Sequence, residues 1–242
     1  MPNRKSPLEM ARAANASARA AVSMLHEATE DLTPRLAKLY TGIVHDVMRE
    51  MGLRDFTLPH TLHPVTVART IAGPVFTVRG KVTKTDAHQS LLAWTGFLSK
   101  AKAGHVVVIA ANDDEVAHMG ELSGETLMRK GVPGVVVDGG ARDIEFLMEM
   151  GFAVYARYAT PRDITGYWMV DALDVPVKIG KVNIAPHDYL LADRDGIVIL
   201  PRDRAAEIVA KAATALGTES QIRTAILGGM DPQEAYLKFG KF

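Results

Sequence analysis

The sequence of 242 residues contains no cysteine. It can therefore form no disulfide, no thiolate metal site and no cysteine nucleophile. Net charge is absent too, because 28 Lys and Arg balance 28 Asp and Glu. This balance argues against a nucleic-acid partner bound by bulk electrostatics.

Long hydrophobic runs are also missing. The longest clearly apolar run, Val106–Ala111, is far shorter than the roughly 20 residues of a membrane-spanning helix. Arg4 and Lys5 are followed by no apolar segment, so the N-terminal region does not read as a secretory signal. We expect a cytoplasmic protein with no membrane partner.

Four common catalytic motifs do not occur: GxxxxGK[ST], GxGxxG, HExxH and GxSxG. Their absence argues against P-loop nucleotide hydrolysis, a Rossmann dehydrogenase, the HExxH zinc proteases and the common serine hydrolases. His60 and His63 are three residues apart, but flanking prolines disfavour a helix there. Nothing in that pattern places both rings on one metal ion.

The sequence alternates between short apolar runs and amphipathic segments, which favours a mixed α/β fold. A single unbroken helix is expected from Thr33, its N-cap, to Gly52. Further helices are expected over residues 86–101, 120–130 and 144–150, after Pro201, and from Asp231–Pro232. Strands are expected over residues 70–80, 106–110, 135–137 and 153–156, followed after Pro161 by an antiparallel meander or a second small sheet.

We expect the chain to divide into three parts. Residues 1–32 are rich in Ala, Ser and Arg and form an N-terminal arm, which could be a frayed terminus or a segment that clasps a neighbouring subunit. Residues 33–217 form the α/β domain. Residues 218–242 form a C-terminal helical tail.

The most informative segment is GVPGVVVDGGARD. A buried strand is expected to end at Asp138, and the two glycines that follow allow a sharp turn. Arg142 and Asp143 come next, beyond the carboxyl end of a strand, where ligand sites gather in α/β sheets. Arginine can bind a carboxylate with two hydrogen bonds, and aspartate offers a hard oxygen to Mg²⁺. The alternative is structural: Asp143 caps a helix and Arg142 pairs locally.

A second segment, HMGELSGETL, contains a loop that enters a helix. Gly120, Glu121, Leu122 and Ser123 span that entry. Amides in the first turn of a helix lack intrahelical acceptors and can bind an anion. The alternative is an ordinary helix start.

These motifs occur in a defined order: GExL, then GVxGVVVDGxxRD, then TP, then DxDG followed by an apolar strand and Pro. In this order they resemble the RraA-like family, over about Tyr40 to Arg223. That family includes the 4-hydroxy-4-methyl-2-oxoglutarate/4-carboxy-4-hydroxy-2-oxoadipate aldolases and the regulators of ribonuclease activity A. The resemblance implies a swivelling β/β/α fold, here with helical N-terminal and C-terminal extensions. It also implies homotrimers or homohexamers with sites at subunit interfaces.

The resemblance also implies residue roles. Arg142 corresponds to the arginine that binds the carboxylate and keto oxygen of pyruvate, and Asp143 to the carboxylate that holds Mg²⁺ (or Mn²⁺), partly through water. The loop from Gly120 to Ser123 corresponds to the amides that hold the substrate. Glu219 corresponds to an acid that reaches the metal waters of a neighbouring subunit.

The complete Arg-Asp pair favours the enzyme branch of the family. The expected function is a metal-dependent class II aldolase that cleaves 4-hydroxy-2-oxo acids to pyruvate through an enolate, with oxaloacetate decarboxylase side activity. Two alternatives stay open: a non-catalytic regulatory or binding protein, and an enzyme of this fold acting on another 2-oxo or hydroxy acid. The chain departs from the family's usual Pro-Gly-Asp turns at His105 and His187, and from a usual glycine at Lys181.

Overall fold

The computed structural model describes residues 31–67 and 69–240. Residues from Thr33 onward form one compact unit. The N-terminal arm predicted for residues 1–32 lies outside the described residues, apart from its last two positions.

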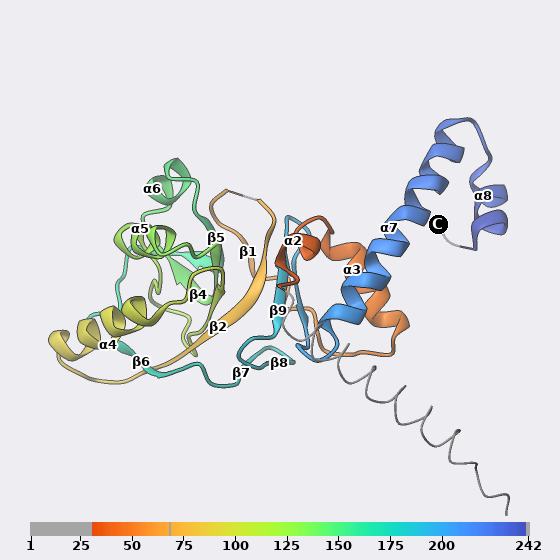
Figure 1. Ribbon diagram of the computed structural model, residues 1–242. Helices are drawn as coiled ribbons and strands as arrows, with labels where there is room; N and C mark the ends of the chain where they lie inside the picture. The colour runs from red at the N-terminus through yellow and green to blue at the C-terminus, as the bar shows by residue number, and fades with distance from the viewer. Residues whose placement is uncertain (1–30, 68, 241–242) are drawn as a thin grey trace, which may run out of the picture. The chain divides into compact units, whose positions relative to one another are not determined.

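An eight-stranded sheet forms the centre of this unit (Figure 1). Its hydrogen-bonded order is β1 (His63–Pro64), β5 (Ala153–Ala159), β4 (Gly134–Ala141), β3 (Val106–Ala110), β2 (Ile71–Val82), β9 (Tyr189–Ala192) and β10 (Ile197–Leu200). β6 (Trp168–Leu173) pairs with the second half of β2, and β7 (Val177–Ile179) and β8 (Val182–Ile184) form a separate hairpin. Strands β2 to β5 run parallel, whereas the strands after Pro161 pair antiparallel. The α/β expectation is confirmed, and the later segments form both an extension of the main sheet and a small second sheet.

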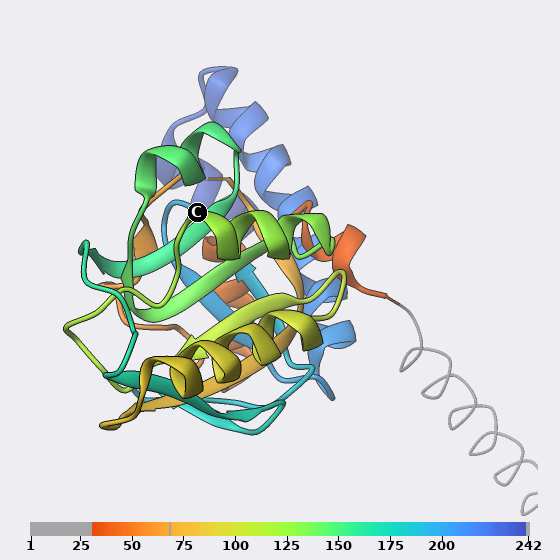
Figure 2. The same cartoon turned by 90° about the vertical axis from the view of Figure 1, so that its left-hand side faces the viewer.

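The two faces of the parallel strands enter different apolar cores. Val135 and Val137 pack with α4 (Ala87–Lys100), α5 (Glu121–Arg129) and α6 (Ile144–Glu149). Val136 points to the other face and lies in a second core with residues of the β7–β8 hairpin and of β9 and β10. Figure 2 shows α4, α5 and α6 on the side nearest the viewer. The alternating side chains of buried strands therefore serve both layers.

The predicted single helix from Thr33 to Gly52 is wrong. The chain forms α2 (Thr33–Leu36), a turn, and α3 (Thr41–Glu50). The Asp193 carboxylate accepts hydrogen bonds from the backbone N–H and the hydroxyl of Thr41, each at 2.7 Å. This cap comes from a residue 152 positions away, so local sequence spacing could not reveal it.

The prediction that the central strand ends at Asp138 is also wrong. β4 continues to Ala141, and neither of its two glycines after Asp138 has a positive φ. A Cβ atom at Gly139 would lie 2.5 Å from Nδ1 of His118, and one at Gly140 would lie 2.4 Å from the Tyr158 ring. These glycines make room for two rings rather than a turn.

The C-terminal part is helical. α7 (Ala205–Leu227) runs without a break past residue 217, and α8 (Pro232–Phe239) begins at Asp231. The Asp231 side chain accepts the N–H groups of Gln233 and Glu234, as expected for an N-cap. Over the described residues, no helix is both long and apolar enough to cross a membrane.

Candidate functional site

A cavity of about 530 Å³ lies between α4, the start of α5 and the segments that follow β4 and β5. The predicted residues Arg142 and Asp143 line it, and so does the whole predicted loop Gly120, Glu121, Leu122 and Ser123. The structure thus brings both predicted segments to one cavity. Glu219 is the predicted site residue that does not line it.

Backbone and carboxylate contacts join the two segments. The N–H of Arg142 donates to the Met119 carbonyl at 2.8 Å, and the N–H of Glu121 donates to Oδ2 of Asp143 at 3.1 Å. Asp143 therefore caps α5 from a neighbouring loop, while its own backbone turns in the left-handed region at φ 56°. A Cβ atom at Gly120 would lie 2.6 Å from that carboxylate, so glycine allows the close approach.

The guanidinium of Arg142 lies between two carboxylates but stays accessible to a ligand in the cavity. Its Nε lies 3.5 Å from Oδ2 of Asp143, and Nη1 lies 3.6 Å from Oδ2 of Asp163. Both distances exceed those of a close charge-assisted hydrogen bond. The Arg142 side chain is 39% exposed, so it can turn its N–H groups toward an anion in the cavity.

A divalent cation is compatible with this arrangement. Asp143 offers half-exposed carboxylate oxygens at the cavity wall, and Asp163 is a second carboxylate there. Within the described part of the chain, no three His, Cys, Asp or Glu residues form a closed metal site. Mg²⁺ usually takes one or two protein carboxylates and keeps several waters, so an open site of this kind suits it.

Three features of the cavity were not predicted from the sequence. Asp163 approaches Arg142, and Leu91 and Trp94 of α4 form part of an apolar wall. The indole N–H of Trp94 donates to Oγ of Ser123 at 2.9 Å, which leaves the Ser123 hydroxyl proton free to point elsewhere. Asp163 lies two residues after the Thr160-Pro161 motif of the family resemblance and could have been singled out. The α4 residues carry no comparable signal.

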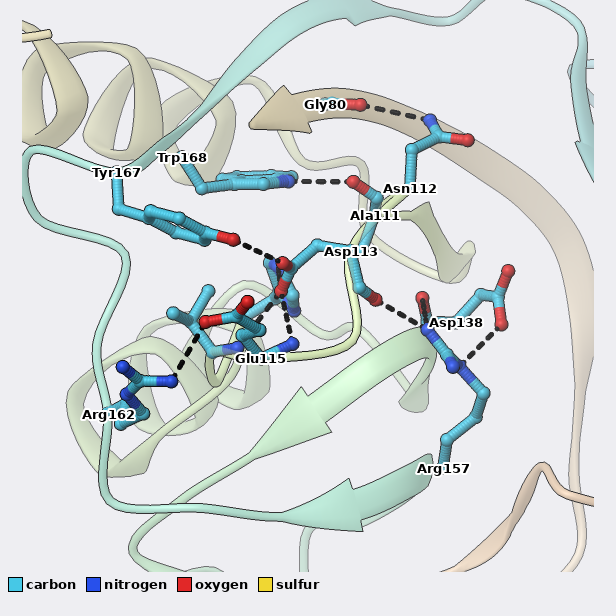
Figure 3. Close-up of polar contacts among 12 residues, drawn as sticks. Gly80, Ala111, Asn112, Asp113, Glu115, Asp138, Arg157, Arg162, Tyr167 and Trp168 are labelled. Atoms are coloured by element: carbon cyan, nitrogen blue, oxygen red, sulfur yellow. Dashed lines mark hydrogen bonds and ion pairs between the residues drawn. The ribbon is translucent and has the colours of Figure 1, made fainter. Parts of the chain in front are cut away.

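A polar frame holds the chain that leads into this cavity (Figure 3). The carboxylate of Asp113 accepts the Val116 N–H at 2.9 Å and the Tyr167 hydroxyl at 3.2 Å. Arg157, from β5, donates to the backbone carbonyl of Asp113 and pairs through Nε with Asp138 at 2.9 Å. The loop after β3 is thus fixed by Arg157 of β5, which pairs with Asp138 of β4, and by Tyr167, just before β6, ahead of Gly120.

His118 is among the residues that line the cavity, although it is almost fully buried. Its ring packs edge-on against Trp168, with centroids 4.7 Å apart, and its Nε2 lies 3.3 Å from Oδ2 of Asp113. Burial lowers the pKa of His118 to about 4, although the Asp113 carboxylate opposes this shift. The ring is therefore neutral at pH 7, and it packs against Trp168 at the edge of the site.

Glu219 lies on α7. Its carboxylate accepts the Tyr40 hydroxyl and pairs with Arg223 at 2.9 Å. It borders a separate shallow hollow with Ile222 and Ile226. Figure 1 shows α7 at one end of the described unit and α4, α5 and α6 at the other. Any role of Glu219 at an Arg-Asp pair would thus require a second subunit, and that role stays a prediction.

Comparison with known proteins gives relatives of modest identity. A Legionella pneumophila protein, DlpA, is 26% identical over 216 residues, or 85% of this chain, but the chain spans only 33% of DlpA. A Halalkalibacterium halodurans protein, provisionally named 4-hydroxy-4-methyl-2-oxoglutarate aldolase, is 27% identical, with 88% of this chain and 97% of that protein covered. A Thermus thermophilus protein with the same aldolase name is 34% identical over 105 residues, covering 43% of this chain and 63% of that protein.

Solved structures agree with the fold. RraAS2 of Streptomyces coelicolor, described as an unusual member of the RNase ES inhibitor RraA family, superposes with a TM-score of 0.71 at 27% identity. The match covers 79% of this chain and 95% of that one. The RraA-like family model, described as Aldolase/RraA, matches residues 41–199, more than half of the chain. On these grounds the chain belongs to the RraA-like family.

Proposed function

We propose that this protein is a divalent-metal-dependent class II aldolase that cleaves 4-hydroxy-2-oxo acids and releases pyruvate. One observation carries the proposal: Arg142, Asp143 and the first turn of α5 meet at a single cavity. The aldolase names of two relatives support the same reaction class.

The substrate would be held by its 2-oxo acid end. The planar fork of Arg142 suits the carboxylate, and a lysine could not reproduce its two parallel hydrogen bonds. The Glu121 N–H is already used by Asp143. The following amides, of Leu122 and Ser123, belong to the helix turn that lacks intrahelical acceptors, so they suit an anionic oxygen.

Carbon–carbon cleavage leaves negative charge on the keto oxygen of the pyruvate unit. Mg²⁺ or Mn²⁺ held by Asp143 would supply Lewis-acid stabilisation of that charge. Arg142 would stabilise the same charge by hydrogen bonding, and loss of one such positioned donor typically costs about 10²–10³ in rate. The same enolate forms when oxaloacetate loses CO₂, so oxaloacetate decarboxylation is part of the proposal.

The proposal also includes the setting of the site. We place the enzyme in the cytoplasm as a homotrimer or homohexamer, with Glu219 of one subunit near the site of the next. Its small-molecule partner is a 2-oxo acid.

The test is pyruvate release from oxaloacetate by the purified protein, with Mg²⁺ and then with EDTA. Asp143→Ala should lose the metal-dependent rate. Glu149→Gln, an exposed charge change on α6, is the matched control and should keep it. Because Asp143 caps α5, circular dichroism should confirm that the variant is folded.

Release no faster than with Mg²⁺ alone, for oxaloacetate and for a panel of 4-hydroxy-2-oxo acids, would contradict the proposal. It would favour the regulatory branch of the family, and a search for a protein partner would follow. If EDTA does not affect the release of pyruvate, the reaction is supported but its dependence on a metal ion is excluded.

A further inference from the structure

We infer that His105 and His187 form a second metal site, outside the cavity, that takes an imidazole-preferring cation such as Zn²⁺. The two residues are 82 positions apart, yet Nε2 of His105 lies 3.4 Å from Nδ1 of His187. His105 directly precedes β3, and His187 lies in the turn before β9. Neither residue lines the cavity around Arg142, so the inference does not depend on the proposed reaction.

The hydrogen bonding of His105 fixes its tautomer. Its Nδ1 lies 3.1 Å from the Ala103 carbonyl oxygen, which can only accept, so Nδ1 carries the proton. Nε2 of His105 then presents a lone pair to His187. Metal-binding histidines commonly donate their second ring N–H to a backbone carbonyl in this way, which orients the ring.

The spacing between the two rings is compatible with a shared metal. Nε2 of His105 and Nδ1 of His187 lie 3.4 Å apart, which is long for a direct hydrogen bond between them. Two nitrogens bound to one tetrahedral Zn²⁺ at about 2.0–2.1 Å lie about 3.3–3.4 Å apart. The ring centroids are 5.4 Å apart with planes inclined at 77°, so the rings approach without stacking.

His187 lies in a turn that is fixed by its backbone. Its φ of 68° is in the left-handed region, which is uncommon for residues other than glycine, although asparagine, aspartate and histidine are enriched there. Two hydrogen bonds join this turn to Val75 of β2: the His187 N–H donates to the Val75 carbonyl at 3.1 Å, and the Val75 N–H donates to the Asp188 carbonyl at 2.8 Å. The turn therefore holds the His187 ring in a defined position beside His105.

The surrounding charges are mixed. Burial lowers the pKa of His187, and Lys102, His105 and Arg202 lower it further, whereas Asp174 opposes them. The ring is therefore neutral and able to bind metal at pH 7. Lys102 is paired with Asp174 at 2.6 Å, which limits its repulsion of a cation.

Two imidazoles select among metals. Nitrogen ligands suit Zn²⁺, Ni²⁺ and Cu²⁺, whereas Mg²⁺ prefers oxygen. In the described part of the chain, no third His, Cys, Asp or Glu completes a closed site with them. Water would fill the remaining positions, and the metal would tie the loop before β3 to the turn before β9 across β2.

Calorimetric titration of the full chain with Zn²⁺, in the presence of saturating Mg²⁺ to occupy oxygen sites, tests the inference. The wild type should bind one Zn²⁺ per protomer through this pair. His105→Asn and His187→Asn should each weaken that binding at least tenfold. Asparagine at 187 tolerates the left-handed backbone, so the turn should persist. His88→Asn, an exposed histidine on α4, is the matched control and should bind as the wild type does.

Thermal unfolding gives a second readout. Zn²⁺ at about five times its dissociation constant should raise the Tm of the wild type by about 2–4 °C, and should not raise that of the two pair variants. Absence of zinc binding, or equal binding in the wild type and the pair variants, would overturn the inference. In that case the two rings form only a long hydrogen bond.

Discussion

At the scale of single residues, Arg142 is distinguished by its position rather than by burial. It is the guanidinium that lines the cavity, and two carboxylates steady it at 3.5 and 3.6 Å without enclosing it. Its loose pairing matters because an arginine fully used in salt bridges could not also bind a substrate carboxylate.

Arg142→Ala should therefore lower kcat/KM for pyruvate release by about 10²–10³ or more. Arg142→Lys should recover only part of this loss, because the ammonium keeps the charge but not the fork. Steady-state kinetics of the two variants beside the wild type measure the difference. Wild-type rates in both variants would remove Arg142 from the mechanism.

His118 predicts a pH dependence of stability. Its pKa in the folded protein is about 4, below the ordinary value of 6.5. Above pH 6.5 both states are neutral at this position, so the contribution is complete. As the pH falls from 6.5 toward 4, only the unfolded state binds a proton, and the free energy of unfolding should fall by up to about 3 kcal/mol.

Urea denaturation between pH 7 and 4.5 measures this slope. His118→Asn should flatten it, because the titrating ring is gone, even where the variant is less stable overall. His88→Asn, exposed on α4, should leave the slope unchanged. An equal slope in wild type and His118→Asn would show that other groups cause the acid sensitivity.

At the scale of elements, sequence periodicity located most helices and strands because each depends on its own residues. The buried run of β3 and the Asp231–Pro232 start of α8 are local signals of this kind. Failures occurred where a distant residue decides the structure. The Asp193 carboxylate accepts the Thr41 N–H at the start of α3. The rings of His118 and Tyr158 occupy the space that side chains at the two glycines of β4 would need.

The same distinction applies to the candidate site. Arg142 and Asp143 lie in one contiguous motif and could be predicted from it. Trp94, by contrast, enters the cavity only because α4 packs beside α5, with its indole N–H on Ser123. No spacing along the chain relates residues 94 and 123, so only the fold could show that α4 forms a wall of the site.

That wall leads to a prediction about substrate. Leu91, Trp94 and Leu98 of α4 border the cavity, and among its described lining residues Arg142 is the one permanent cation. The carboxylates there belong to Glu121, Asp143 and Asp163. A second carboxylate on the substrate would meet no cation within the protomer. We expect 4-hydroxy-2-oxo acids with an apolar C4 substituent to be cleaved with higher kcat/KM than dicarboxylic ones.

Leu91→Arg should reverse this preference. Leu91 is 47% exposed, so arginine can replace it without burying its charge. A new charge-assisted hydrogen bond is worth about 1.5–3 kcal/mol, or roughly 10–100-fold in the ratio of the two kcat/KM values. Leu92→Arg, 56% exposed but outside the cavity lining, is the matched control. A wild-type preference for dicarboxylic substrates would refute the prediction, even if aldol cleavage itself is observed.

At the scale of the whole molecule, one protomer presents two separate pieces of the proposed machinery. Arg142 and Asp143 lie with α5, whereas Glu219 lies on α7 beside Tyr40 and Arg223. Burial, together with the contact with Glu219, raises the pKa of Tyr40 to about 12, so the phenol stays protonated and can donate to the carboxylate. The Glu219 carboxylate is thus held in place on α7, but not at the cavity of its own chain.

If assembly brings Glu219 to a neighbour's cavity, two defective variants should complement each other. Asp143→Ala lacks the proposed metal ligand but keeps Glu219, and Glu219→Gln has the opposite defect. Co-refolded mixtures should then contain interfaces with both wild-type carboxylates, and pyruvate release should exceed that of either variant alone. Native mass spectrometry would establish that mixed oligomers form. Mixed oligomers without recovered activity would mean that each cavity works within its own protomer, and that Glu219 serves only to pair α7 with Tyr40.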